Sequence, residues 1–188
     1  SACNEAKNET QKVETDESFN KVKTAGVFVL GLDDSFPPMG FRDKENNIIG
    51  FDIDLAKEVC ARLGIELKTQ PISWDAKEQE LNTGKIDCIW NGMSVDSARA
   101  KAMNLSDPYL KNRMIFTVKD KALANLEFLK GKKIAVQNGS TAQKLLDASE
   151  AGKAAKEIVP FDDNQTALMD LEKGGVDAVF LDEIVAKY

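Results

Sequence analysis

The sequence predicts an α/β protein with two lobes. Short apolar segments typical of strands alternate with amphipathic segments typical of helices, and this order favours parallel sheets connected by crossover helices. The alternation begins again after Val118, so a second lobe is expected, with the boundary near residues 111–113. The chain has 188 residues, of which 43% are hydrophobic and 30% charged, an ordinary composition for a globular protein. We therefore expect lobe 1 over residues 18–111 and lobe 2 over residues 112–188.

The elements of lobe 1 follow from its apolar runs and from the residues that end them. In order, we expect a helix over 18–24, a strand over 27–32, a loop over 33–40, a turn at 46–47, a helix over 52–63, a strand over 65–69, a helix over 75–81 and a strand over 86–90. Gly26, Gly64 and Gly84 end the helices or turns before them. Pro37-Pro38 stiffens the loop, because each proline ring restricts the backbone around it. The helix over 52–63 is predicted to turn its apolar residues inward, namely Ile53, Leu55, Ala56, Val59 and Leu63.

Lobe 2 repeats the alternation. We expect strands over 113–118, 133–136, 157–159 and 176–181, with helices over 141–148 and 164–173. Gly174-Gly175 ends the second of these helices.

Composition excludes several classes of function. The net charge is −6 with no basic cluster, so nucleic acid is not an expected partner. The chain contains no histidine, which excludes histidine-based catalysis and histidine metal ligands. Cys60 and Cys88 lie in apolar segments and are expected to fill core volume rather than to form a disulfide or bind metal. We expect neither a metal ion nor a cofactor.

The N-terminal segment is predicted to be a tether. Residues 1–17 are acidic and poor in apolar residues, and such a segment cannot bury enough surface to fold alone. Ser1-Ala2-Cys3 is similar to the end of a bacterial lipobox, in which the cysteine is lipidated after removal of the signal peptide. We therefore expect Cys3 to anchor an extracytoplasmic protein to the membrane. The alternative is an ordinary cysteine in an N-terminal tail.

One stretch, from Ile86 to Arg99, has the composition of a receptor for a small carboxylate. Its apolar strand stops at Asn91-Gly92, a pair that favours a turn and allows a ligand to come close to the backbone. Ser94 then supplies a hydroxyl, and Arg99 supplies a guanidinium fork that can bond both oxygens of a carboxylate. Taken alone, these residues make a weak motif.

Further motifs give this stretch a context. They occur in order along the chain as Asp34-Ser35-Phe36-Pro37-Pro38, Gly50-Phe51-Asp52-Ile53-Asp54-Leu55, Ser73-Trp74-Asp75, Leu81-Asn82-Thr83-Gly84-Lys85-Ile86-Asp87, Ser106-Asp107-Pro108-Tyr109, Lys130-Gly131-Lys132-Lys133, Gln137-Asn138-Gly139-Ser140-Thr141 and Val176-Asp177-Ala178-Val179-Phe180-Leu181-Asp182-Glu183. With these motifs the chain resembles the bacterial solute-binding proteins for polar amino acids, from Ser18 to the last residue. The resemblance implies the two-lobed type II fold of periplasmic binding proteins.

In lobe 1 the resemblance assigns roles to five residues. Arg99 matches the arginine that grips the α-carboxylate of the amino acid. Ser94 and Gly92 match residues that bond its head group. Phe36 and Trp74 match the two aromatic residues that hold its side chain, where each ring could attract a cation by about 0.5–2 kcal/mol.

In lobe 2 the resemblance places Thr141 at the carboxylate and Asp182 at the ammonium. Thr141 begins a helix whose N–H groups favour an anion, although it could simply cap that helix. Asp33, Asn91 and Gln137 fall where family members adjust the side-chain pocket. Asp33 favours a cationic amino acid such as arginine or lysine, and glutamine stays open.

The mechanism implied is closure of both lobes on an amino acid, followed by docking on an ABC permease in the membrane. No catalytic residue is expected. A second reading is a lyase on the same fold, such as a cyclohexadienyl dehydratase, with Glu183 and Asp33 as the candidate acids. A third is a form that binds no amino acid.

Family members continue well beyond the position of Asp182. We therefore expect a truncated chain in which lobe 2 lacks its return crossover and lobe 1 lacks its closing elements. Apolar surface and a sheet edge would then be uncovered, and a homo-oligomer or a segment swap could cover them.

Overall fold

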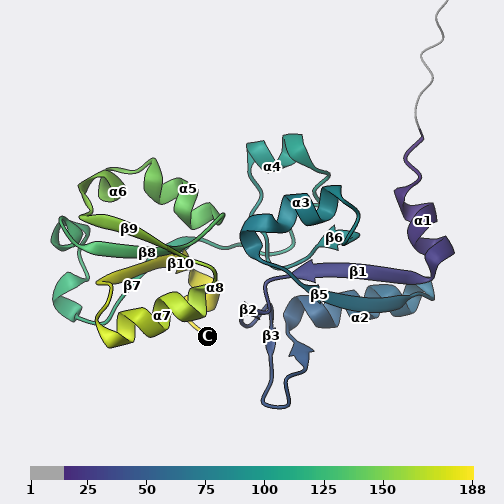
Figure 1. Ribbon diagram of the computed structural model, residues 1–188, viewed down its shortest axis with the longest axis horizontal. Helices are drawn as coiled ribbons and strands as arrows, with labels where there is room; N and C mark the ends of the chain where they lie inside the picture. Colours follow the sequence, from purple (N-terminus) through teal and green to yellow (C-terminus); the bar gives the residue numbers. More distant parts are fainter. Residues whose placement is uncertain (1–14) are drawn as a thin grey trace, which may run out of the picture.

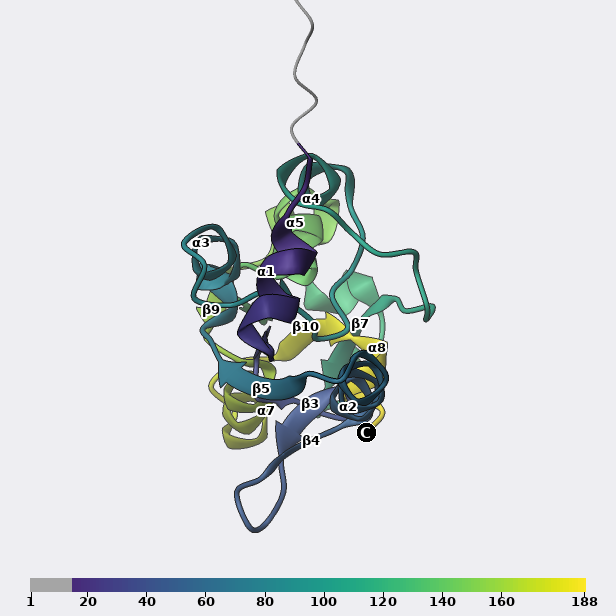
Figure 2. The same cartoon turned by 90° about the vertical axis from the view of Figure 1, so that its right-hand side faces the viewer.

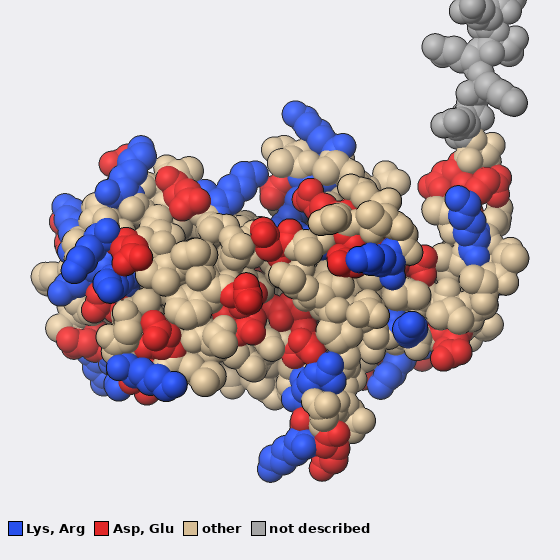
Figure 3. All heavy atoms as spheres, viewed as in Figure 1, with Lys and Arg blue, Asp and Glu red and all other residues tan. Residues whose placement is uncertain are grey.

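The computed structural model describes residues 15–188 and contains two α/β lobes (Figure 1). Cys3, the predicted lipidation site, lies outside the described residues, as does most of the predicted tether. Within residues 15–188, no helix has the length and apolar character needed to cross a membrane. Figure 3 shows basic and acidic side chains interspersed over one face, with acidic groups near the middle, where the lobes meet.

Lobe 1 is built on three parallel strands in the order β5-β1-β6. The strands are β1 (Val27–Leu32), β5 (Glu66–Pro71) and β6 (Cys88–Ile89). The helices are α1 (Ser18–Ala25), α2 (Phe51–Leu63), α3 (Lys77–Asn82) and α4 (Ser97–Ala102), with a 3₁₀ turn η1 (Trp74–Ala76). Helix α2 lies on one side of the sheet and α3 on the other (Figures 1 and 2).

The loop predicted over 33–40 contains more structure than expected. Three short strands form a small antiparallel sheet in the order β2-β3-β4, with β2 (Ser35–Phe36), β3 (Gly40–Arg42) and β4 (Ile48–Ile49). Asn46 adopts a left-handed φ of 67° between β3 and β4, which confirms the turn predicted there. The loop prediction was wrong for β2 and β3. Each of these strands is too short to show the alternation of apolar and polar residues by which a strand is predicted.

The inward face of α2 also differs from the prediction. Asp52, Ile53, Ala56 and Cys60 are buried in α2, and Ile53 and Ala56 pack against Leu30 and Leu32 of β1. Leu55, Val59 and Leu63 are instead exposed. The apolar residues of α2 surround more of the helix than one packed face can cover, so periodicity did not identify the buried side.

Lobe 2 is built on four strands in the order β7-β10-β8-β9. The strands are β7 (Met114–Val118), β8 (Lys133–Gln137), β9 (Glu157–Phe161) and β10 (Ala178–Asp182). The helices are α5 (Thr141–Asp147), α6 (Glu150–Ala154), α7 (Asn164–Lys173) and α8 (Glu183–Ala186), with 3₁₀ turns η2 (Lys121–Leu123) and η3 (Leu126–Leu129). Strand β7 runs antiparallel to β10, whereas β8 runs parallel to both of its neighbours.

Two buried clusters form the core of lobe 2. One includes Ile134, Val136 and Leu146 on the side of α5 and α6. The other lies on the side of α7 and also contains Phe36 and Met39 of lobe 1. The two lobes are therefore in apolar contact at β2 and α7, close to the site described below.

The carboxyl ends of four strands meet between the lobes. Asp33 follows β1, Asn91 follows β6, and β8 and β10 end at Gln137 and Asp182. Open α/β sheets bind ligands beyond the carboxyl ends of their strands. The topology thus brings the predicted ligand residues of both lobes to one place.

Candidate functional site

The predicted ligand residues converge on a small space between the lobes. The residues around this space are Phe36, Trp74, Asn91, Gly92, Met93, Ser94, Arg99, Met114, Gln137, Ser140, Thr141 and Asp182. Every predicted ligand residue except Asp33 is among them. Met93, Met114 and Ser140 were not predicted, because their residue types carry no specific signal in the sequence.

Arg99 links the two lobes. Its Nη1 donates to the carbonyl oxygen of Ser94 at 2.8 Å and to Oγ1 of Thr141 in lobe 2 at 3.1 Å. The Asp96 side chain caps α4 by accepting from the backbone N–H of Arg99 at 2.8 Å. Arg99 is only 7% exposed, and its side chain is among those that line the space.

The start of α5 is organised differently from the prediction for Thr141. Ser140 is the capping residue, since its Oγ accepts from the backbone N–H of Gln143 at 3.1 Å. Thr141 is the first residue of the helix and does not cap it. Its hydroxyl is therefore free to contact Arg99 and to face the space between the lobes.

Asp182 is a buried carboxylate at the end of β10. It is 8% exposed, and its Oδ2 accepts from Nδ2 of Asn112 at 2.5 Å. Burial raises the pKa of Asp182 to about 6, although the bond from Asn112 and the charge of Arg99 oppose this shift. An opposite charge placed beside this buried carboxylate would therefore be favourable.

Asp33 lies behind the site rather than at it. Its Oδ2 accepts from Nε2 of Gln137 at 2.8 Å, across the lobe boundary. Asn91 bonds the backbone of Asp33, with Nδ2 donating to its carbonyl at 3.2 Å and Oδ1 accepting from its N–H at 3.1 Å. Burial raises the pKa of Asp33 to about 6. Gln137 thus bonds this carboxylate and lines the space, whereas Asp33 is not among the residues around it.

The two predicted aromatic residues are both nearly buried. Phe36 and Trp74 are each 6% exposed. Phe36 packs into the apolar cluster shared with lobe 2, so it has a core role as well as a place at the site. Lys77, which sequence reasoning missed, places its Nζ 4.8 Å from the centroid of the Trp74 ring.

Asp52 holds the chain at Asn91-Gly92 in place. It is fully buried, its Oδ2 accepts from the backbone N–H of Gly92 at 2.5 Å, and its Oδ1 accepts from the hydroxyl of Tyr109 at 2.6 Å. Gly92 has a φ of 56°, which favours glycine, so the turn predicted at Asn91-Gly92 is confirmed. The sequence offered one signal for the role of Asp52, namely a charged residue at the start of an amphipathic helix. It could not identify the two hydrogen-bond partners, because they lie 40 and 57 positions away along the chain.

Replacing Asp52 with alanine is expected to lower the free energy of unfolding by about 3 kcal/mol, because two partly buried hydrogen bonds to a charged acceptor would be lost. Asp54→Ala is the matched control, since Asp54 is exposed in the same first turn of α2 and should change stability by about 0.5 kcal/mol. Urea denaturation measures both variants. If the free energy of unfolding falls equally in the two variants, the hydrogen bonds of Asp52 to Gly92 and Tyr109 do not stabilise the fold.

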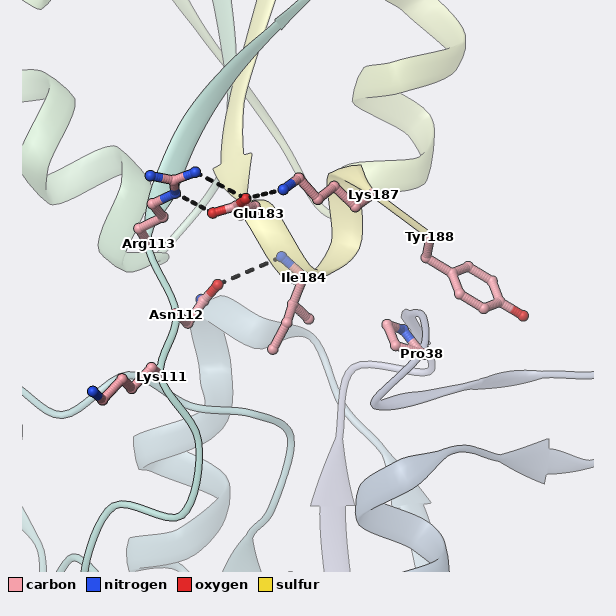
Figure 4. A pocket seen from close by; sticks show the side chains of 8 residues that line it. All are labelled: Pro38, Lys111, Asn112, Arg113, Glu183, Ile184, Lys187 and Tyr188. Carbon is pink, nitrogen blue, oxygen red and sulfur yellow. Dashed lines mark hydrogen bonds and ion pairs between the residues drawn. The ribbon is translucent and has the colours of Figure 1, made fainter.

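A second and larger cavity lies beside residues 111–113, where the chain passes from lobe 1 to lobe 2 (Figure 4). It has a volume of about 570 Å³ and is formed by Pro38, Lys111, Asn112, Arg113, Glu183, Ile184, Lys187 and Tyr188. Glu183, a candidate acid for a lyase, is found here and bonds Arg113 and Lys187. These bonds lower the pKa of Glu183 to about 2, so it is a poor proton donor.

The chemistry of the residues, rather than cavity size, makes the smaller space the candidate site. Arg99, Asp182 and the hydroxyl of Thr141 converge on the smaller space, whereas the charged groups of the larger cavity are mostly exposed. Within residues 15–188, no group of three or more His, Cys, Asp or Glu side chains is placed to hold a metal ion.

Comparisons with known proteins identify the family. The bacterial extracellular solute-binding proteins of family 3 match residues 28–187. The L-cystine-binding protein TcyJ of Escherichia coli (strain K12) is 29% identical over 170 residues, which cover 89% of this chain and 63% of TcyJ. The chain therefore spans less than two thirds of that relative's length.

Two solved structures show the same fold. A substrate-binding protein of an ABC uptake transporter from Streptococcus pneumoniae, with bound histidine, is 33% identical with a TM-score of 0.86, and the match covers 92% of this chain and 72% of that one. An arginine-bound, truncated ArgBP from T. maritima is 37% identical with a TM-score of 0.82, covering 89% and 79%. The chain belongs to family 3 of the bacterial extracellular solute-binding proteins and has the type II fold of periplasmic binding proteins over the part that it spans.

Proposed function

We propose that this chain binds a free polar amino acid between its lobes and, as part of an ABC importer, delivers it to a membrane permease. The observation that carries the proposal is the placement of Arg99 and Asp182 around one space, on opposite lobes. A free α-amino acid carries a carboxylate and an ammonium on the same carbon. A cation from one lobe and an anion from the other match these two charges.

Each head-group residue has a distinct role in this proposal. Arg99 bonds the α-carboxylate with its guanidinium fork, and the hydroxyls of Ser94 and Thr141 complete the oxygen contacts. Asp182 pairs with the α-ammonium, and the carbonyl of Gly92 accepts a second of its hydrogens. Binding would therefore replace the direct contact between Arg99 and Thr141 with contacts through the ligand.

The lobes must separate to admit the amino acid. The space between them is about 20 Å³, whereas pockets for small molecules are usually about 300 Å³ or larger. A ligand that contacts both lobes stabilises a closed state around itself, because those contacts do not exist when the lobes are apart. The closed form is the one proposed to dock on the permease.

The side-chain end of the site favours a cationic or an amide-bearing amino acid. Phe36 and Trp74 offer aromatic surfaces, and Asn91 and Gln137 offer amides. Asp33 bonds Gln137, and a ligand cation or amide that displaced Gln137 would gain access to a carboxylate. Arginine, lysine and glutamine are the proposed ligands.

Membrane attachment through Cys3 completes the proposal. Members of this family are extracellular solute-binding proteins. A lipid on Cys3 would hold the lobes near the permease, with residues 4–17 as the tether.

A thermal-shift screen of the twenty amino acids and cystine, followed by calorimetry, tests the proposal. We expect one or a few polar amino acids to raise the melting temperature, because a ligand that binds only the folded state stabilises it. If no amino acid does so, the binding proposal is wrong for this chain. Loss of prephenate or arogenate absorbance on adding the protein would instead support a lyase.

A further inference from the structure

Lys77 makes a contact between the lobes that the proposed ligand contacts do not include. It begins α3 in lobe 1, and its Nζ donates to the carbonyl of Gly139 in lobe 2 at 3.0 Å. The same Nζ donates to the carbonyl of Trp74 at 3.2 Å. We propose that Lys77 is a clasp that stabilises the closed arrangement of the two lobes through a contact that needs no amino acid.

The burial of Lys77 supports this role. The residue is 5% exposed, and a lysine is rarely buried unless its ammonium has partners. Two carbonyls and the ring of Trp74 supply them, and one of the carbonyls is present only when lobe 2 is close. When the lobes are apart, the ammonium of Lys77 therefore loses the carbonyl of Gly139 and keeps only its partners in lobe 1.

The backbone of Gly139 is a second observation at the same point. Gly139 has a φ of 72°, and a Cβ atom there would lie 2.8 Å from Oδ1 of Asp75 and 2.9 Å from its Cα. Only a residue without a side chain lets the two backbones come this close. The approach presents the carbonyl of Gly139 to Lys77.

Other contacts also join the lobes, but they are either exposed to solvent or would be replaced by the proposed ligand. Arg99 bonds Thr141 directly in this structure, and the proposed ligand would replace that bond. Lys144 and Asp96 form a cross-lobe ion pair at 3.8 Å, with the lysine side chain 59% exposed, so solvent screens it.

The bond between Gln137 and Asp33 is also buried and joins the lobes, but the proposed ligand would displace Gln137. Lys77 is buried and is not itself a proposed contact of the amino acid, although its ammonium lies against the ring of Trp74. Its bond to Gly139 joins the lobes with no ligand between the two groups, so it would add to the stability of the closed arrangement.

Lys77→Met tests the clasp, because methionine keeps an unbranched side chain and removes the charge and the donors. Small-angle X-ray scattering of the full chain, without any amino acid, measures the radius of gyration. We expect the closed parent to match the structure. In the variant the ratio of closed to open molecules should fall about tenfold, as expected for losing one charge-assisted hydrogen bond. The radius of gyration should therefore increase.

Lys144→Met is the matched control, since it removes a cross-lobe lysine at the surface and should leave the scattering unchanged. Lys77→Arg keeps a charged donor and should stay closer to the parent than Lys77→Met. Thermal melting confirms that each variant is folded, and Lys77→Gln replaces Lys77→Met if the latter does not fold.

Two outcomes would overturn the clasp. One is a parent whose lobes are already apart without an amino acid, and the other is a folded Lys77→Met variant that scatters like the parent. The clasp deepens the proposed function, yet this test uses no amino acid. Failure of the proposed function would appear separately, as a screen in which no amino acid shifts the melting temperature.

Discussion

Replacing Arg99 with alanine is expected to weaken amino-acid binding at least about 100-fold, because truncating one partner of a buried charge pair costs about 3 kcal/mol or more. The ligand carboxylate would lose its only adjacent guanidinium among the described residues around the space and would be left in a nearly buried site. Isothermal titration calorimetry with the amino acid found in the thermal-shift screen measures the change.

Arg62→Ala is the control for this variant. Arg62 is an exposed arginine of α2 that pairs with Glu58, so its removal should leave binding unchanged. Arg99→Lys keeps the charge but loses the planar fork, and its affinity should fall between those of the parent and Arg99→Ala. An Arg99→Ala variant that binds like the parent would remove Arg99 from the site.

Replacing Asp182 with asparagine is expected to separate binding from stability. Binding should weaken about 100-fold, since the ligand ammonium would lose its buried anionic partner. The melting temperature of the unliganded protein should stay level or rise at pH 7, because a neutral amide is easier to bury than an ionised carboxylate. A merely structural role for Asp182 would instead lower stability.

The pH dependence of binding should also show whether Asp182 is the partner of the ligand ammonium. Its pKa is raised to about 6, and the ammonium prefers the ionised form, so the affinity of the parent should rise with pH through 6. Between pH 7 and pH 5 we expect about a tenfold loss, since each pH unit below the pKa removes tenfold of the ionised form. Calorimetry at both pH values should show a nearly flat profile for Asp182→Asn.

Asp33→Asn is the control for that profile. The pKa of Asp33 is also raised to about 6, but this carboxylate bonds Gln137 and does not line the space where the α-ammonium is proposed to lie. Asp33→Asn should therefore keep the part of the pH dependence that the α-ammonium contributes. A profile that flattens in Asp33→Asn and persists in Asp182→Asn would reverse the two roles.

The same shifts predict how the unliganded protein responds to pH. The ordinary pKa of an aspartate is 3.8, so the folded state binds more protons than the unfolded state between about pH 4 and pH 6. The contribution of Asp33 and Asp182 to the free energy of unfolding therefore falls as pH rises through this window. Comparing the parent with the double asparagine variant by urea denaturation isolates this contribution.

The sequence predicted much of the element order, because each helix and strand leaves a local pattern. Helix α7 occurs over Asn164–Lys173 and β1 over Val27–Leu32, both as expected. The residues that converge between the lobes were also predictable, since most follow strand ends and lie in motifs that the family resemblance aligns. Their ligand contacts stay a prediction.

Pairings between distant residues could not be predicted. Gln137 and Asp33 are 104 positions apart in the sequence. Their hydrogen bond could therefore not be predicted, and Asp33 was expected at the site although it lies behind Gln137. Lys77 follows Trp74 in a polar segment, and nothing in that segment indicates that its ammonium is buried against Gly139.

The sequence by itself therefore determined the α/β class, the order of the elements and the set of charged and aromatic groups near the cleft. Only the tertiary structure decided which carboxylate lines the cleft, which face of α2 is buried and which lysine is buried between the lobes. The physical reason is that periodicity and turn chemistry act over a few residues, whereas burial and hydrogen bonding depend on which distant segments the fold brings into contact.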